Sequence, residues 1–257
     1  MKRFAIGDIH GNLRALNQCL ARSGFNKEED LLIQLGDVAD GYSYVYECVE
    51  ELLSIKNTIF IKGNHDQWMK DWFLIDTHPC DWLQGGEGTL KSYTKNLGFG
   101  YGPRFPQWGV AEIGYKTGMA PSDLPQSHQD FWNNQKPYFK DSDNNLFVHG
   151  GFNRHFTLDE HREDIFYWDR DLFSCALSAR SGKQKLKFKE EFKNIFIGHT
   201  QTTYWDKTNK PIFADIVINL DQGAGWDGKL TIMDVDTKEY WQSDLATELY
   251  PGEKGRK

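Results

Sequence analysis

Polar side chains that can bind metal ions follow five apolar runs of this sequence, each at the point where the run ends. The five segments are "FAIGDIHGN", "LIQLGDVADG", "IFIKGNHD", "LFVHGG" and "IFIGHT". Each run reads as a buried strand, and side chains that follow the carboxyl ends of neighbouring strands face the same crevice of a sheet. We therefore expect six of these side chains to converge in one small volume. They are Asp8, His10, Asp37, Asn64, His149 and His199.

These six residues carry the donor atoms that a divalent metal ion requires. Taken singly, Asp8 could cap a helix, Asp37 could form a turn, and Asn64 could be an ordinary loop residue. Carboxylates crowded at one sheet edge repel each other and lose hydration, so a purely structural role leaves their recurrence unexplained. A divalent cation converts this repulsion into coordination. Because the set contains no thiolate, it suits manganese, our first expectation, with iron or zinc as alternatives.

The number of these residues predicts two metal ions. Six ligands would overfill one catalytic ion that must keep positions open for water and substrate, whereas two ions that share a bridging carboxylate accommodate them. Such a pair, roughly 3.5–4 Å apart, activates a bridging hydroxide as nucleophile and binds the oxygens of a phosphoryl group. The sequence therefore predicts a two-metal phosphoesterase.

Strand and helix patterns alternate over the first quarter of the chain. The runs "RFAIGD", "LLIQLGD" and "TIFIKGN" predict three strands, and apolar residues at helical spacing after the first two runs predict two helices. Asn12 is a suitable N-cap for the first helix. This alternation indicates βαβ units with parallel strands. Near the other end of the chain, "GKLTIMDVDTKEYWQS" predicts a hairpin.

The chain of 257 residues is expected to form one domain over residues 1–243. A Trp- and Gly-rich insertion at about 68–145 interrupts the alternation, with a helix expected over residues 126–138. Residues 244–257 are expected to be a disordered tail. The tryptophans of the insertion could stack a nucleobase or shape a peptide groove, although aromatic residues in such a segment more often form a small core. They are Trp68, Trp72, Trp82, Trp108 and Trp132.

Composition and charge exclude several classes of protein. The chain is 39% hydrophobic and 26% charged, and no apolar run approaches the ~20 residues that span a membrane, so we expect a cytoplasmic protein with no membrane partner. The four cysteines are widely separated, which argues against a structural zinc site and favours core thiols at Cys19 and Cys48. The net charge of -7 argues against general nucleic-acid binding but does not exclude a nucleotide.

In this order, "GDIHGN", "GDVADG", "GNHD", "VHGG" and "GHT" resemble the calcineurin-like metallophosphoesterase superfamily. Within it the chain is most similar to the phosphoprotein phosphatase group, specifically the small bacterial and phage serine/threonine phosphatases. The resemblance extends from about Arg3 to Gln242. It implies a four-layer α/β fold in which a central β-sandwich of two mixed sheets is flanked by helices. It also implies hydrolysis of phosphomonoesters, most directly those of phosphoproteins.

The resemblance further implies a role for each residue of the motifs. Asp37 would bridge the two metal ions. His65 would be the general acid that protonates the leaving group, and Asp40 would orient its imidazole and raise its pKa. The remaining ligands would be Asp8 and His10 for the first ion, and Asn64, His149 and His199 for the second.

Phosphate recognition is where the sequence departs from the group's pattern. Gly41 stands where the pattern has an arginine that binds phosphoryl oxygens, and Lys62 stands where an arginine is often found. Arg170, in "YWDRDLF", matches a phosphate-binding arginine of the bacterial members, and Arg154, just after "VHGG", could substitute for the missing one. Loss of a bidentate guanidinium leaves the metal chemistry intact and leaves the substrate class open.

Two other functions remain as alternatives. The first is a nucleotide-directed hydrolase acting on dinucleoside polyphosphates, cyclic nucleotides or nucleic-acid end phosphates, which the glycine at position 41 and the tryptophan-rich insertion keep open. The second is a non-catalytic module that metal ions only stabilise. Such a module would be expected to have lost a metal ligand or the His65–Asp40 pair, and this sequence retains all of them.

Overall fold

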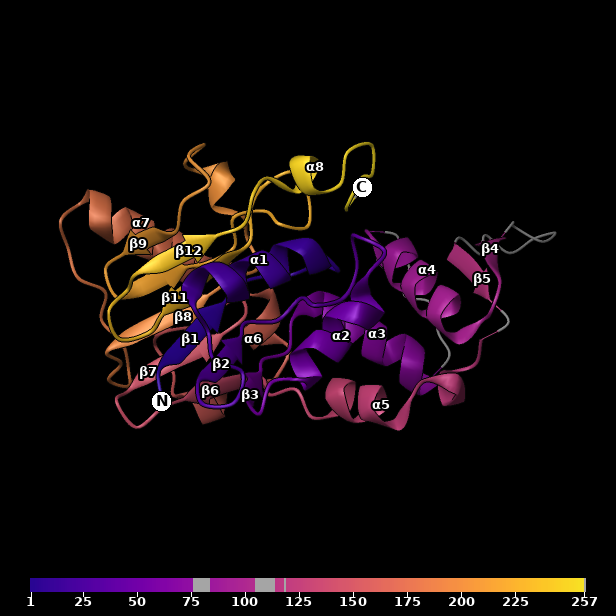
Figure 1. The fold of residues 1–257 in the computed structure, drawn as a ribbon. Helices are drawn as coiled ribbons and strands as arrows, with labels where there is room; N and C mark the ends of the chain where they lie inside the picture. Colours follow the sequence, from indigo (N-terminus) through magenta and orange to yellow (C-terminus); the bar gives the residue numbers. More distant parts are fainter. Residues whose placement is uncertain (76–83, 105–113, 118, 257) are drawn as a thin grey trace.

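The structure is a computed structural model that describes residues 1–75, 84–104, 114–117 and 119–256 (Figure 1). Two five-stranded sheets and a two-stranded one account for its strands. The strands of the first sheet are β1 (Arg3–Ile6), β2 (Leu31–Gln34), β3 (Asn57–Phe60), β11 (Thr231–Asp234) and β12 (Tyr240–Gln242). Those of the second are β6 (Tyr138–Lys140), β7 (Asn145–Val148), β8 (Asn194–Ile197), β9 (Ile212–Ala214) and β10 (Val217–Asn219). The small sheet pairs β4 (Tyr101–Arg104) with β5 (Gly114–Thr117).

Both large sheets are mixed. The first has the order β12-β11-β1-β2-β3, in which β1, β2 and β3 are parallel as the strand and helix alternation predicts, and β11 and β12 form the predicted antiparallel hairpin. The second has the order β6-β7-β8-β10-β9, with antiparallel strands at both edges. The helices are α1 (Leu13–Ser23), α2 (Val45–Leu53), α3 (Asn64–Ile75), α4 (Gly86–Leu97), α5 (Gln126–Asn133), α6 (Ile165–Trp168), α7 (Asp171–Ser181) and α8 (Ala246–Leu249).

The two sheets pack face to face, and helices cover their outer faces. Alternate residues of each strand face opposite ways, so Ile33 of β2 and Phe147 of β7 enter the core between the sheets, while Leu32 faces α1 and α2 and Leu146 faces α7. Phe147 stacks on Phe196 of β8 with ring centres 4.9 Å apart. Each such side chain contributes about 1.5–3 kcal/mol on burial. The four-layer sandwich that the resemblance implies is confirmed.

Local sequence signals explain the helix that follows β1. The side chain of Asn12 accepts a hydrogen bond from the backbone N–H of Ala15 at 3.1 Å, as expected of an N-cap. Gly24 ends α1 with a left-handed φ of 64°. Cys19 and Cys48 are fully buried in the apolar cluster that α1 and α2 form against the sheet, as predicted for core thiols.

The stretch from about 68 to 145 contains α4 and α5, which pack on α2 and α3, and the small sheet, which packs on α4. It also contains β6, a strand of the second large sheet. Trp72 and Trp132 are buried in the main apolar cluster, in line with a core role, whereas Trp82 and Trp108 lie outside the described residues. The helix expected over residues 126–138 is shorter, because α5 ends at Asn133. The backbone of Lys136 bonds instead to Phe60 and Lys62, and a proline follows.

Residues 244–256 differ from the expected disordered tail. They form α8 and continue in an ordered course, drawn in yellow beside α1 in Figure 1. The ring of Tyr250 stacks on that of Tyr42 at 4.6 Å, and its hydroxyl accepts a hydrogen bond from the backbone N–H of Arg14 at 3.0 Å. Although the residues that follow Tyr250 in the sequence are mostly polar, burial of its ring against Tyr42 fixes the segment.

In the part of the chain that the structure describes, no helix is long and apolar enough to cross a bilayer.

Candidate metal centre

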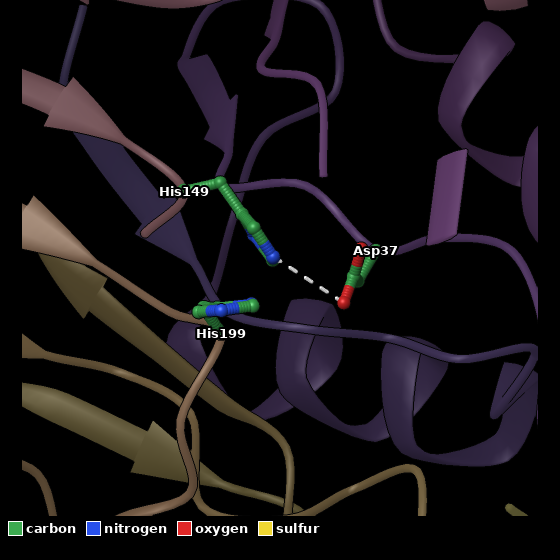
Figure 2. Close-up of side chains that lie close together, drawn as sticks. All are labelled: Asp37, His149 and His199. Atoms are coloured by element: carbon green, nitrogen blue, oxygen red, sulfur yellow. Dashed lines mark ion pairs between the residues drawn. The ribbon is translucent and has the colours of Figure 1, made fainter. Parts of the chain in front are cut away.

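The loops that follow β1, β2, β7 and β8, together with the start of α3, bring the six expected ligands together. Possible ligand atoms of Asp8, His10 and Asp37 lie within 4.8 Å of one another, and so do those of Asp37, His149 and His199. Asp37 therefore belongs to both groups. In Figure 2 the imidazole of His149 points toward the Asp37 carboxylate, and His199 lies beside both. All five side chains are buried.

Asn64 joins the second of these groups. Its Oδ1 lies 2.9 Å from Nδ1 of His199 and 3.3 Å from Nε2 of His149. The same Nε2 of His149 is 3.3 Å from Oδ2 of Asp37. The amide oxygen, the two imidazoles and the carboxylate thus surround one point, as the ligands of a single cation do.

Neighbouring groups prepare these side chains to bind cations. Nδ1–H of His10 donates to the backbone carbonyl of Ala39 at 2.9 Å, and Nδ1–H of His149 donates to that of Leu35 at 2.8 Å. These bonds make Nδ1 a donor in both rings, so Nε2 faces Asp37 and is the nitrogen that a metal ion would bind. Oδ1 of Asp8 and Nε2 of His199 are buried and have no hydrogen-bonding partner among the described residues. An unpaired buried carboxylate oxygen such as Oδ1 of Asp8 fits a bound cation, which would coordinate it.

The backbone of this region is strained. His10, Asp37, Asp40 and His199 have positive φ angles of 49°, 57°, 70° and 69°, which side-chain-bearing residues rarely adopt. Such conformations cost of order 1–3 kcal/mol each and persist where surrounding contacts hold them, often at functional sites. Only glycine fits at position 63, because a Cβ there would lie 2.0 Å from Oδ1 of Asp37.

The charges of the cluster are those of a cation site. Burial raises the pKa of Asp8 well above its usual range, and repulsion from Asp221 adds to the effect. Burial would lower the pKa of His149, but Asp37 and Asp8 raise it to about 9. A proton on His149 therefore supplies positive charge beside the carboxylates, and binding of a metal ion there would release that proton.

Asp221 was not among the residues expected from the sequence. It lies just beyond β10 and is buried. Its charge raises the pKa of Asp8 more than that of Asp37 does. Burial raises its own pKa to about 6. A signal was available, because the run "DIVINLD" ends on a carboxylate in the same way as the five runs that were singled out.

His65 and Asp40 form a buried pair next to the cluster. Nδ1 of His65 lies 2.6 Å from Oδ2 of Asp40, and Oδ1 of Asp40 accepts the hydroxyl proton of Thr89 at 2.7 Å. The backbone N–H of His65 donates to Oδ1 of Asp37 at 2.9 Å. The imidazole is thereby held with Nδ1 toward Asp40 and linked to the shared carboxylate, as an oriented proton donor requires.

The pKa of His65 contradicts the expectation. Burial lowers this pKa to about 3, Asp37 acts in the opposite direction, and the charges of Arg256 and Arg170 lower the pKa further. The expected rise of this pKa is therefore not found, because loss of hydration outweighs the nearby carboxylates. To donate a proton from Nε2, this imidazole needs an anion nearby that stabilises its charged form, and a phosphoryl group is such an anion.

The three basic residues expected to bind phosphate have different surroundings. Arg170 precedes α7, is exposed, and lowers the pKa of His65 and His199 through its charge. The ammonium of Lys62 forms an ion pair with Glu163. Nη1 of Arg154 donates to Nε2 of His155 at 2.6 Å, and none of its described contacts reaches the cluster. Of the three, Arg170 is the one whose charge is a main cause of a pKa shift at an expected ligand, His199.

Asp66 is a further buried carboxylate that the sequence analysis did not single out. Its Oδ1 accepts the backbone N–H groups of Val38 and Ala39 at 2.9 and 3.0 Å. Its Oδ2 accepts those of Asp37 and Gly63 at 2.8 and 3.1 Å, together with a side-chain N–H of Gln135 at 3.0 Å. Five donors thus hold the loop that carries Asp37 against the start of α3.

We expect Asp66→Asn to lower the free energy of unfolding by about 2–4 kcal/mol, because an amide would place N–H groups against buried N–H donors. Urea denaturation measures this loss. Asp71→Asn is the matched control, since Asp71 lies in the same helix and accepts a hydrogen bond from the side chain of Gln67. Equal stabilities of the two variants would contradict the role assigned to Asp66.

Comparison with known proteins identifies relatives of the whole chain. A sequence-family model described as calcineurin-like phosphoesterase matches residues 1–215. The symmetrical bis(5'-nucleosyl)-tetraphosphatase of Neisseria meningitidis is 25% identical over 274 residues, which cover 96% of each chain. The enzyme of the same name from Pseudomonas putida is 23% identical over 296 residues, which cover 96% of this chain and 94% of that one.

Solved structures share the same architecture. The crystal structure of a candidate diadenosine tetraphosphatase matches 94% of this chain and 92% of its own, with a TM-score of 0.59 at 13% identity. A cold-active protein tyrosine phosphatase of a psychrophilic Shewanella species matches 95% of this chain and 80% of its own, with a TM-score of 0.55 at 16% identity. At these identities the likeness concerns the fold.

Proposed function

This chain belongs to the calcineurin-like phosphoesterase family, whose members hydrolyse phosphoesters at a binuclear centre of divalent metal ions, and on this premise we propose that its substrate is a dinucleoside polyphosphate. The reaction would add water to an inner phosphorus of a dinucleoside tetraphosphate and release two nucleoside diphosphates. The observation that carries this proposal is the alignment, along 96% of both chains, with a relative named as a symmetrical tetraphosphatase. The serine/threonine phosphatase function, our first expectation, stays a prediction with weaker support.

The roles of the site residues form part of the proposal. Two ions, expected to be manganese, would supply Lewis-acid charge to phosphoryl oxygens and lower the pKa of a bound water. Asp37 would be shared between the ions, His65 would protonate the leaving group, and Asp40 would orient His65. Arg170 would bind a phosphate of the substrate. The other ligands would be Asp8, His10, Asn64, His149 and His199.

An exposed indole beside the centre supports a nucleotide substrate. The side chain of Trp168 is 40% exposed, and its ring lies 6.1 Å from that of His199 and 5.6 Å from that of Trp68. Because every nucleobase can stack on an aromatic ring, an indole at the rim of the centre can hold a base while the phosphates reach the ligands. A phosphoserine side chain offers no ring to such a surface.

The proposal is tested by comparing substrates on one preparation of protein loaded with manganese. The panel contains a dinucleoside tetraphosphate, a phosphoserine peptide, a cyclic nucleotide and an aryl phosphodiester. We expect the highest kcat/KM for the tetraphosphate, with nucleoside diphosphate as the only nucleotide product on chromatography. A higher kcat/KM for the phosphopeptide would instead favour the protein phosphatase function.

We expect Trp168→Ala to raise KM for the dinucleoside tetraphosphate about 5- to 150-fold, because stacking contributes about 1–3 kcal/mol for each base. Hydrolysis of inorganic tripolyphosphate, which carries no base, should change little. Trp205→Ala is the matched control, since Trp205 is also exposed and packs on Phe173 instead of at the centre. An unchanged KM for the dinucleotide in Trp168→Ala would exclude stacking on this indole.

A further inference from the structure

The last described residues of the chain return to the candidate metal centre. The backbone N–H of Arg256 donates to the carbonyl of Gly225 at 2.7 Å. The preceding residue, Gly255, is buried so tightly that a Cβ on it would lie 2.2 Å from the same carbonyl oxygen and 2.7 Å from the ring of Tyr42. Tyr250, five residues before Gly255, stacks on the same Tyr42 ring and holds the beginning of this segment. The position of Arg256 is therefore fixed by packing.

The guanidinium of Arg256 lies at the cluster itself. Its Nη1 is 3.4 Å from Nε2 of His10, the ring nitrogen that faces Asp37. Its Cζ lies 5.2 Å from the centre of the Trp226 ring, so the aromatic ring supports one face of the guanidinium. Its Nε is buried without a hydrogen-bonding partner, and no ion pair joins it to a carboxylate in the described part of the chain.

The carboxylate of Asp221 attracts the Arg256 guanidinium, but cations bound at the cluster would make its position unfavourable unless a further anion joins them. Its Nη1 approaches Nε2 of His10, which belongs to one of the two groups of possible ligands, so the guanidinium lies next to the expected ions. Divalent ions bound by these ligands would repel it. A phosphoryl group held at the centre would place negative oxygens beside the guanidinium and turn this repulsion into attraction.

Arg256 also occupies the space beside Gly41, the position at which the sequence departs from the expected arginine. A Cβ on Gly41 would lie 3.4 Å from Cγ of Arg256 and 2.9 Å from the backbone oxygen of His10, and the φ of Gly41 is 91°. A side chain at position 41 would therefore be strained and would compete with Arg256. Among the side chains that the structure describes, the guanidinium beside position 41 is that of Arg256.

We propose that Arg256 binds a phosphoryl group of the substrate and supplies the guanidinium that position 41 lacks. This inference rests on the proposed phosphoesterase function and adds a specificity-determining residue to it. The planar guanidinium can donate two parallel hydrogen bonds to two phosphoryl oxygens, which an ammonium cannot do. Arg170 lies at the start of α7, whereas Arg256 approaches His10 from the end of the chain, so the two arginines reach the centre from different segments.

The test compares Arg256→Ala, Arg256→Lys and wild type, each loaded with manganese. We expect Arg256→Ala to weaken the binding of inorganic phosphate, measured by calorimetry, about 10- to 100-fold, and to lower kcat/KM for a phosphoester by at least as much. Arg256→Lys should recover only part of the loss, because it restores the charge without the planar donors. Added guanidinium ion, at concentrations that leave the protein folded, should partly rescue Arg256→Ala.

Lys254→Ala is the matched control, since it removes one positive charge from an exposed residue of the same segment and should change neither quantity. Manganese content should remain that of wild type in every variant. Unchanged phosphate binding in Arg256→Ala would overturn the proposal, and so would a gain in kcat/KM, which would mean that the segment blocks the site. A loss of manganese would also overturn it, because Arg256 would then act through His10. If wild type hydrolysed no phosphoester, the proposed function would fail while phosphate calorimetry still tested Arg256.

Discussion

Asp37→Asn is expected to abolish binding of the metal pair and to reduce phosphoester turnover by at least roughly 10³-fold. Asp37 is the residue shared by both groups of possible ligands. Its Oδ1 accepts the backbone N–H of His65, and its Oδ2 faces the Nε2 atoms of His10 and His149 at 3.6 and 3.3 Å. An asparagine can keep the first interaction through its carbonyl, but its amide group would point N–H donors at the place where the cations bind.

Metal content after dialysis against manganese, together with turnover of an aryl phosphate, measures this effect. Asp215→Asn is the matched control, because Asp215 has a similar left-handed φ of 53° and accepts the backbone N–H of Leu186, away from the centre. Asparagine tolerates that conformation, so the control should retain wild-type activity. Two bound ions and normal turnover in Asp37→Asn would contradict the proposed centre.

His65→Ala should keep its metal ions but hydrolyse esters of poor leaving groups about 10²- to 10⁴-fold more slowly, because such esters depend most on general acid catalysis. The effect should be smaller for a dinucleoside tetraphosphate, whose leaving group is a phosphate with a second pKa near 6. Its proton affinity is low enough for it to leave with less assistance from His65. His65 contacts Asp40 and Asp37 without belonging to either group of possible ligands, which is why metal binding should persist.

Rates for a series of phosphate monoesters, from dinitrophenyl phosphate to an alkyl phosphate, test this prediction. Activity of His65→Ala should fall more steeply along the series than that of wild type, and the dinitrophenyl ester serves as the internal control. Parallel series for the two proteins would show that His65 does not protonate the leaving group. Loss of manganese from the variant would instead show that the imidazole supports the ligands.

The strands and the residues at their ends could be predicted from the sequence because both depend on local patterns. Apolar runs such as that of β2 specify a buried strand, and a ligand such as Asp37 follows within a few residues of the run. The terminal hairpin and the N-cap Asn12 are equally local. The short α5 shows the limit of such reasoning, because backbone bonds from Lys136 to β3 override the helical pattern.

The residues that were missed depend on contacts between distant parts of the chain. Arg256 contacts His10 across 246 positions, and a tail composition gives no sign of this contact. Asp66 follows His65 in the motif, but its five donors come from the loop after β2, from Gly63 and from Gln135. The pKa of His65 was expected to rise because one partner was considered, whereas burial of the whole ring decides the direction.

The placement of the ligands has a consequence for the stability of the sandwich. Asp8 and Asp37 extend from the first sheet, whereas His149 and His199 extend from the second. A pair of chelated cations would therefore cross-link the two halves of the molecule at their shared edge, closing chain loops of more than a hundred residues. The same coordination bonds would then serve both turnover and cohesion, and the melting temperature would rise with the free concentration of the cation.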